Sequence, residues 1–122
     1  MSSIILPHSH GNVTQKVIEH MPGDEAFFKV SECFSLLGDS SRLKILWLLC
    51  HFEECVSNIS AAVQMSPPLV SHHLKLLKTN GLITSRREGK EVYYALASTD
   101  ITEVLHHALD EMMGIHCPRE AE

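Results

Sequence analysis

The feature that most constrains the fold of this chain is a change of hydrophobic period at Gly81. Before it, residues 67 to 80 place leucines at helical spacing, with Pro67 at the expected first helical position and Ser66 as the expected cap. After it, apolar and polar residues alternate on both sides of residues 88 to 90, a Glu-Gly-Lys sequence typical of a hairpin turn. A hairpin of this size is not stable alone in water, so we expect it to pack against helices.

Helical patterns lie on both sides of this helix and hairpin. Apolar stripes over residues 24 to 37 and 99 to 113 indicate terminal helices, the second with an expected capping box of Asp100 and Glu103. Two short helices joined by a tight turn just before Gly81 are typical of a helix-turn-helix. We therefore predict a mainly α fold with a small β-hairpin, a winged helix-turn-helix that dimerises through its N- and C-terminal helices. The expected organisation is a flexible arm over residues 1 to 12, this domain over residues 13 to 113 and a tail over residues 114 to 122.

Positive charge is concentrated in the same stretch, although the chain as a whole carries a formal net charge of −5. Five of the ten lysines and arginines lie between residues 71 and 90, where Glu88 is the only acid. A basic helix and hairpin are typical of a surface that lies along the phosphate backbone of a nucleic acid. The alternative is an ordinary solvated surface, which charge alone does not exclude.

Composition and motifs disfavour several other classes of protein. The chain has no apolar run near the roughly 18 to 20 residues of a membrane span and no signal-peptide pattern, so we expect a cytoplasmic protein. Its four cysteines form no CxxC pair, so we expect thiols rather than a disulfide scaffold. No phosphate loop, nucleophile elbow or HExxH motif is present in the sequence, so we do not expect an enzyme. A protein-binding winged helix or a metal-buffering protein remains a less favoured alternative.

Four short motifs, taken in order, resemble those of the ArsR/SmtB family of small repressors. They are LLGDSSRLKIL at residues 36 to 46, VSHHLKLL at 70 to 77, GLI at 81 to 83 and GKEVYY at 89 to 94. The resemblance covers roughly residues 25 to 113. It implies a homodimeric winged helix-turn-helix that binds a palindromic operator on double-stranded DNA when free. It also implies release by an inducer, usually a metal or metalloid ion and sometimes an oxidant or a reactive sulfur species.

The basic helix and hairpin supply the candidate DNA contacts of such a repressor. A single helix contacts only a few base pairs, so useful specificity requires two copies one turn of DNA apart. For His73, packing in the core and a second phosphate contact are both open. The predicted contacts are Ser66, Ser71, His72, His73, Lys75, Lys78, Arg86, Arg87 and Lys90.

The resemblance also implies a metal site near the start of the helix-turn-helix. Residues 54 to 57, Glu-Cys-Val-Ser, keep the first cysteine of the family's motif at this place and lack the second. That family site takes further ligands from the N-terminal arm of the partner subunit, for which His8 and His10 are placed. Cys55, His8 and His10 are therefore the first candidates for binding an inducing metal. Imidazole and thiolate together suit zinc or another transition or soft metal ion.

A second family site bridges the two C-terminal helices of the dimer, and this chain departs from it. Its four positions fall on Ser98, Asp100, Glu111 and Gly114, of which only the two acids can bind a metal. Alternatively, His106, His107, His116 and Cys117 could form a differently arranged site, since His107 and Glu111 lie one helical turn apart. The weaker metal candidates are Asp100, His107, Glu111, His116 and Cys117.

A switch based on cysteine oxidation or on reactive sulfur is the alternative to a metal inducer. Some members of the family join a cysteine of the buried helix to one near the terminal helix, and Cys50 and Cys117 lie in those two regions. Both are displaced by several residues from the expected positions. We therefore predict a repressor that an inducer releases from its operator, and we favour a metal ion over a cysteine switch as that inducer.

Overall fold

The computed structural model describes residues 4–115 of the 122-residue chain, which divides into two compact units, residues 1–32 and 33–122. The first unit contains helix α1 (Asn12–Glu19). Helix α2 (Asp24–Leu37) begins in the first unit and ends in the second. Among the residues described, no helix has the length and apolar character that crossing a membrane requires.

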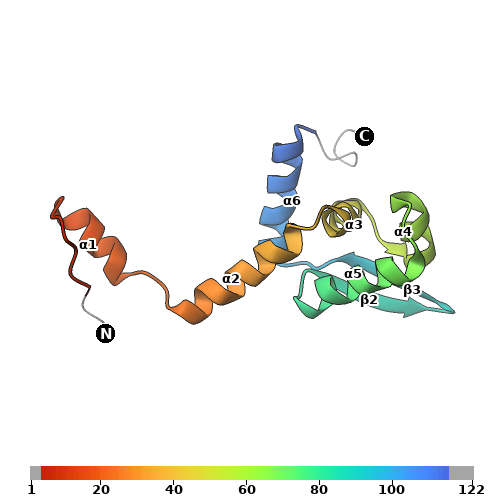
Figure 1. Ribbon diagram of the computed structural model, residues 1–122. Coiled ribbons are helices and arrows are strands. Elements are labelled where there is room, and N and C mark those ends of the chain that lie inside the picture. Colours follow the sequence, from red (N-terminus) through yellow and green to blue (C-terminus); the bar gives the residue numbers. More distant parts are fainter. Residues whose placement is uncertain (1–3, 116–122) are drawn as a thin grey trace. The chain divides into compact units, whose positions relative to one another are not determined.

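The second unit contains a helix-turn-helix followed by a β-hairpin, as Figure 1 shows. The strands form an antiparallel sheet in the order β1-β3-β2. Glu88 pairs with Glu91, so the hairpin turn has two residues, and Gly89 takes the left-handed φ of +63° that glycine tolerates best. The elements of this unit are α3 (Ser40–His51), β1 (Glu54–Cys55), α4 (Val56–Val63), α5 (Pro67–Thr79), β2 (Ile83–Glu88), β3 (Glu91–Leu96) and α6 (Asp100–Met113).

The starts of three helices are set by side chains that accept backbone hydrogen bonds. Asp39 caps α3 by accepting from the backbone N–H of Arg42 at 2.9 Å, and Ser66 caps α5 with Pro67 in its first turn, as expected. The expected capping box of α6 was wrong by one residue. Thr99 is the cap, and the hydroxyl of Thr102 accepts from its backbone N–H at 3.1 Å. A threonine hydroxyl both donates and accepts, so this pair satisfies the helix start without Asp100.

Strand β1 is an element that the sequence pattern did not reveal. It has only two residues, and Glu54 and Cys55 pair with Tyr94 and Tyr93 of β3. Two residues are too few to show the alternation of apolar and polar side chains by which a strand is recognised in a sequence. The segment is a strand because it pairs with the edge of β3 that β2 leaves free. As a result, the hairpin is one part of a three-stranded sheet.

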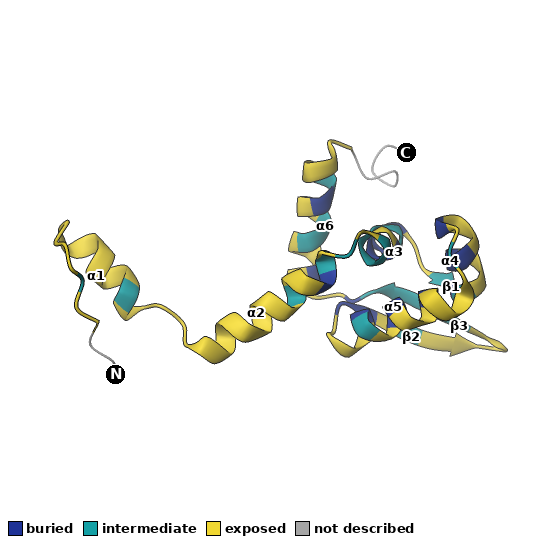
Figure 2. Cartoon of the chain, in the orientation of Figure 1, coloured by how far each residue is buried: buried dark blue, intermediate teal, exposed yellow. Residues whose placement is uncertain are grey.

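The core of the second unit lies between α3, α4, α5 and the sheet. Its fully buried side chains include Ile45 and Leu46 of α3 and Leu74 and Leu77 of α5. These are the apolar sides of amphipathic helices, so their burial leaves the opposite side of α5 in solvent. Figure 2 shows the same division, with the buried residues of α5 on one side of the helix.

The apolar stripe of α6 is only partly covered within the chain. Leu109 is buried against the core, but Ile101, Val104 and Met112 are 60%, 62% and 84% exposed. A group of large apolar side chains exposed on one helix is typical of a contact surface for another molecule. On α2, Phe27, Phe28, Val30 and Phe34 are likewise exposed.

We predict that Leu74→Ala lowers the free energy of unfolding by about 2 to 5 kcal/mol, because it removes a fully buried side chain and leaves a cavity between α3 and α5. Urea denaturation at a fixed protein concentration measures this loss. Leu69→Ala is the matched control, since Leu69 lies on the same helix but is 43% exposed. Equal losses in both variants would contradict the assigned core.

Candidate nucleic-acid interface

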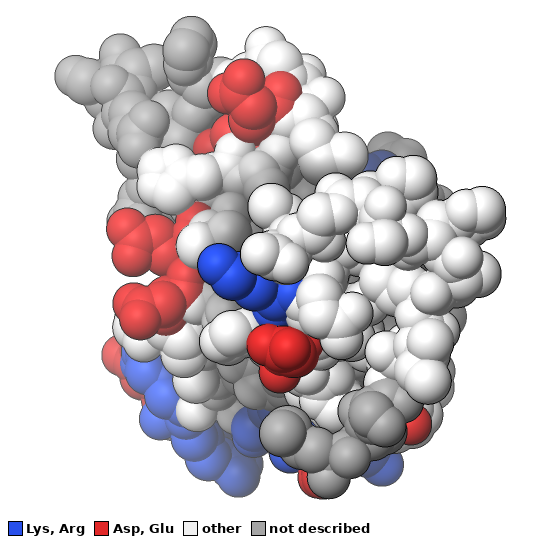
Figure 3. All heavy atoms as spheres, turned by 90° about the vertical axis from the view of Figure 1, so that its left-hand side faces the viewer, with Lys and Arg blue, Asp and Glu red and all other residues white. Residues whose placement is uncertain are grey.

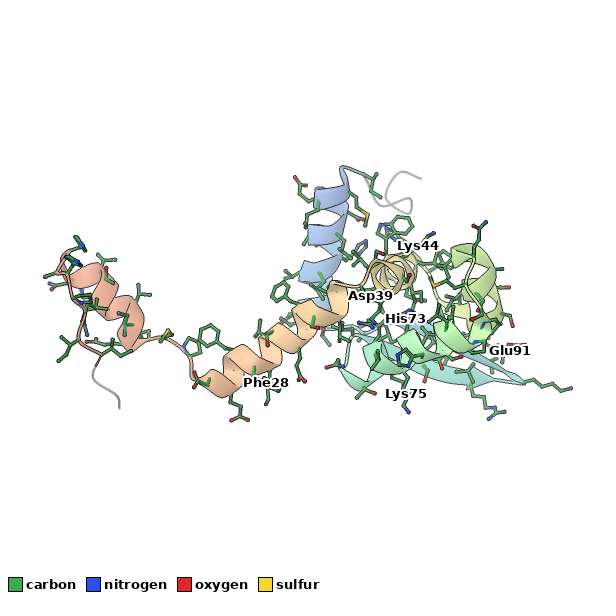
Figure 4. The ribbon with its side chains drawn as sticks, in the orientation of Figure 1. Phe28, Asp39, Lys44, His73, Lys75 and Glu91 are labelled. Carbon is green, nitrogen blue, oxygen red and sulfur yellow. The ribbon has the colours of Figure 1, made fainter. Side chains whose placement is uncertain are left out.

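The outer side of α5 carries exposed polar and basic side chains. Ser71, His72, Lys75 and Lys78 are all exposed, while Val70, Leu74 and Leu77 bury the other side of the helix. The spacing of three and four residues explains the division, because such residues share one face of a helix. In Figure 4 the side chain of Lys75 extends away from α5 on the side opposite the core.

The second helix of the motif is reached through a tight turn after α4. Gln64 ends α4 in the left-handed conformation, with φ 55° and ψ 46°, and Ser66 then caps α5. Ser66 is exposed, and its hydroxyl accepts from the backbone N–H of Leu69 at 3.4 Å. Pro67 and Pro68 have no N–H and that of Leu69 is already bonded, so the donor that this helix start offers to a phosphate is the Ser66 hydroxyl.

His73 is only 5% exposed, so we do not keep it as a DNA contact and correct that part of the prediction. Its Nδ1 accepts from Nε of Arg42 at 3.3 Å. Arg42 also donates from Nη1 to the carbonyl of Leu36 at 3.2 Å, and Asp39 caps the same helix. Figure 4 shows Asp39 and His73 close to each other on α3 and α5. His73 is one residue after the exposed His72, and the rotation of about 100° per residue around the helix is enough to move the side chain from the surface to the core.

The hairpin contains one compensated arginine and two basic residues that form no ion pair with any other residue described. Arg86 makes salt bridges with Glu53 and Glu88, and its guanidinium lies 5.0 Å from the ring centroid of Tyr93. The carboxylates of Glu53 and Glu88 raise the pKa of Arg86, and Arg86 lowers that of Glu53. In the described part of the chain, Arg87 and Lys90 have no carboxylate partner. They are therefore better placed than Arg86 to contact phosphates.

A hydrogen bond ties the helix to the hairpin. Lys78 Nζ on α5 donates to the hydroxyl of Ser85 on β2 at 2.6 Å. The bond leaves the Lys78 charge uncompensated, since serine is neutral. Figure 3 shows lysine and arginine side chains gathered at the lower edge of one face of the molecule.

The first set of predicted metal candidates is divided between the two units. His8 and His10 are exposed in the first unit, with ring centroids 5.9 Å apart. Cys55 belongs to the second unit and is 7% exposed. Cys55 lies on β1 at the start of α4, where its backbone N–H donates to Glu54. A site that joins these three residues stays a prediction.

The weaker candidates are not gathered either, as far as residues 4–115 show. Asp100, His107 and Glu111 are exposed on α6. His116 and Cys117 lie outside the described residues. The predicted thiol pair of Cys50 and Cys117 therefore stays a prediction. Cys50 itself is buried in the core.

A different set of ligating side chains does come together within residues 4–115. It consists of His51 on α3 with His106 and Asp110 on α6. In the sequence, the spacing of four residues places His106 and Asp110 one helical turn apart, as two ligands of one metal would be. His107 and Glu111 have the same spacing, so the sequence does not distinguish the two pairs. His51 has no local signal, because only the packing of α3 on α6 brings it near the other two.

Comparisons with known proteins agree with this geometry. A family model described as "Bacterial regulatory protein, arsR family" matches residues 39–85. The arsenical resistance operon repressor of Staphylococcus aureus is 34% identical over 82 residues, which cover 67% of this chain and 79% of that protein. The chain belongs to the arsR family. This is a family of regulatory proteins, so the prediction that the chain is not an enzyme is confirmed.

Two further relatives of the arsR family extend the comparison. A transcriptional repressor SmtB homolog of Synechocystis sp. is 36% identical over 84 residues, which cover 69% of this chain and 64% of that protein. The chain thus spans less than two thirds of that relative's length. A homodimeric winged helix-turn-helix DNA-binding domain from Mycobacterium bovis superposes with a TM-score of 0.63 at 30% identity, covering 80% of this chain and 96% of that one. The predicted fold class is therefore confirmed.

We predict that His73 makes the folded chain less stable as the pH falls below about 6.5. Burial, more than the nearby charges, lowers the pKa of His73 below its ordinary value of 6.5. The unfolded chain therefore binds this proton more readily than the folded chain, so the free energy of unfolding decreases as acid is added. In His73→Gln, which has no titrating ring, urea denaturation between about pH 7 and pH 5 should show a smaller decrease.

His72→Gln is the matched control for that measurement, because His72 is the exposed neighbour on the same helix. It should change the pH dependence less than His73→Gln does, because the charge of His72 is only a minor cause of the lowered pKa of His73. If His72→Gln and His73→Gln change the pH dependence equally, the assignment of the effect to the buried ring is wrong.

Proposed function

We propose that this chain is a sequence-specific transcriptional repressor that binds operator DNA in the cytoplasm as a homodimer and leaves it when a metal ion binds. The observation that carries the proposal is the exposed polar and basic side of α5 next to the uncompensated Arg87 and Lys90 of the hairpin. In a winged helix-turn-helix, this helix enters the major groove while the wing follows the backbone. The proposed contacts are Ser66, Ser71, His72, Lys75, Lys78, Arg87 and Lys90, with Arg86 in a supporting role.

The metal inducer is supported by the relatives of the chain. The names of two of them describe an arsenical resistance repressor and an SmtB homolog. Binding of an ion releases DNA if it favours a conformation of the protein that holds the two copies of α5 at the wrong spacing. A gel shift with the promoter region of the chain's own gene tests this, repeated with zinc, cadmium, arsenite and a persulfide donor. Absence of any shift without inducer would overturn the proposal.

We expect Lys75→Ala to weaken operator binding and to reduce the slope of log affinity against log salt by about one per chain, since one phosphate contact is lost. Fluorescence anisotropy with labelled operator at several salt concentrations measures both quantities. Lys44→Ala removes the same charge from an exposed position on α3, where Figure 4 shows Lys44 away from Lys75. It should leave the slope nearly unchanged, and equal effects of both variants would refute the assigned face.

The exposed apolar side of α6 supports the dimer part of the proposal. Ile101, Val104 and Met112 form a surface that the described chain leaves uncovered, and burial of this area in a second copy would be favourable. A repressor of this size needs two copies of α5 to reach two half-sites of a palindrome. The solved relative from Mycobacterium bovis is described as homodimeric.

We predict that Val104→Glu converts the dimer into a monomer, because it places a charge in the centre of this apolar surface. Light scattering after size-exclusion chromatography measures the mass, and circular dichroism checks that the chain is still folded. Glu103→Gln, at the neighbouring exposed position, should remain dimeric. A folded Val104→Glu variant with the mass of the wild type would exclude α6 as the dimer contact.

A further inference from the structure

Three side chains with metal-ligating atoms meet where the end of α3 packs against α6. They are His51, His106 and Asp110, and one ligand atom of each lies within 4.8 Å of the other two. Nε2 of His51 is 3.7 Å from Oδ1 of Asp110, and Nε2 of His106 is 3.1 Å from Oδ2 of the same carboxylate. The side chains are 4%, 21% and 14% exposed, respectively, so water has limited access to them.

Several of these atoms lack a hydrogen-bond partner among the described residues. They are Nε2 of His51, Nε2 of His106 and Oδ1 of Asp110, and all are buried. The short approach of His106 to Asp110 does not have the geometry of a hydrogen bond. Buried polar atoms without a partner are rare in native proteins and cost free energy, so three at one place indicate that something else satisfies them.

The other ring nitrogen of His51 determines which atom is available. Nδ1 lies 2.7 Å from the carbonyl oxygen of Trp47, which can only accept, so Nδ1 carries the hydrogen. In the neutral ring, Nε2 then has a lone pair, and this lone pair faces a carboxylate oxygen. Two acceptors that face each other repel unless a cation lies between them. Metal-binding histidines are oriented in the same way, by donating their second nitrogen to a carbonyl or carboxylate.

We propose that His51, His106 and Asp110 bind a divalent transition-metal ion of the Zn²⁺ class, within one chain and between α3 and α6. Two imidazole nitrogens and one carboxylate oxygen are ligands that Zn²⁺ and its neighbours in the first transition series accept, and three protein ligands leave a position open. Zn²⁺ takes such ligands at about 2.0 to 2.2 Å, so the three ligand atoms, now within 4.8 Å of one another, would close around the ion. This set differs from the predicted candidates at Cys55, His8 and His10 and from those at Asp100, His107 and Glu111.

An ion can reach the site from the surface. A hollow of about 400 Å³ beside the start of α6 is lined by residues that include Thr102, Glu103 and His106. His106, with 21% of its side chain exposed, is the ligand nearest to solvent. Of the three ligands, His106 therefore offers an ion its path from the hollow to the site.

The position of the site gives the ion a way to act on DNA binding, and this part rests on the proposed function. α3 packs against α5 in the core, and α6 carries the proposed dimer surface. An ion held by both α3 and α6 fixes the angle between the helix that supports DNA recognition and the helix that supports dimerisation. A change of operator affinity in the usual range for coupled sites, about 5- to 150-fold, would follow.

Direct metal binding tests the site without DNA. Zn²⁺ is titrated into the full-length chain in competition with a chromogenic chelator, and Co²⁺ absorption reports the coordination. We expect Asp110→Asn to lose one bound ion per chain or to weaken its affinity by at least about tenfold, whereas Glu91→Gln, at an exposed position on β3, binds as the wild type does. His106→Asn is a second variant at a more exposed ligand, for use if Asp110→Asn is unfolded by circular dichroism.

Three results would contradict the proposed metal site. Wild-type stoichiometry and affinity in both folded variants would overturn the proposal, and so would a wild-type chain that binds no ion. Loss of the ion in Glu111→Gln, with Asp110→Asn unaffected, would overturn it in favour of the exposed face of α6.

A gel shift with Zn²⁺ then separates the site from the proposed function. If the function is correct, wild type and Asp110→Asn both bind promoter DNA without metal, and Zn²⁺ releases only the wild type. Release of both would overturn the regulatory role of this site. If neither binds DNA while the wild type binds Zn²⁺, the proposed function fails and the metal site stands.

Discussion

The packing of α3 against α5 is the contact on which the rest of the second unit depends. Ile45 and Leu46 of α3 and Leu74 and Leu77 of α5 belong to one hydrophobic core, and all four are fully buried. Burial of each such side chain contributes about 1.5 to 3 kcal/mol relative to exposure. Because one side of α5 is held in this way, its other side has a fixed orientation in solvent. The hairpin and α6 are then placed on a support that already defines the recognition face.

Polar interactions add to this arrangement, and they engage charged groups within the protein, including one that the sequence predicted as a DNA contact. Arg42 connects the end of α2 to His73 of α5, and Arg86 connects the hairpin to Glu53 before β1. Both arginines hold elements together. The free positive charge of the face therefore comes from Lys75, Lys78, Arg87 and Lys90. The basic stretch of the sequence thus has a structural part and a part that remains for the proposed DNA contact.

Helix α6 has two different sides, one with the proposed metal ligands and one with the proposed dimer surface. Leu109 and Thr102 anchor it to the core, with His106 and Asp110 on the side that meets His51. Ile101, Val104 and Met112 face outward. A ligand bound on the inner side can change how the outer side is presented, because a helix moves as a rigid element. Control and dimerisation thus have a common mechanical element in this proposal.

The sequence by itself determined the helices, the hairpin, the family and the basic face, because these depend on local periodicity, on Gly81 and Gly89, and on motifs of adjacent residues. Only the tertiary structure decided that His73 is internal, that Arg86 is compensated and that β1 joins the sheet. It also decided that His51 meets His106 and Asp110. Each of these depends on a contact between residues distant in the chain, and a single sequence carries no signal for which of several equivalent side chains will face another element.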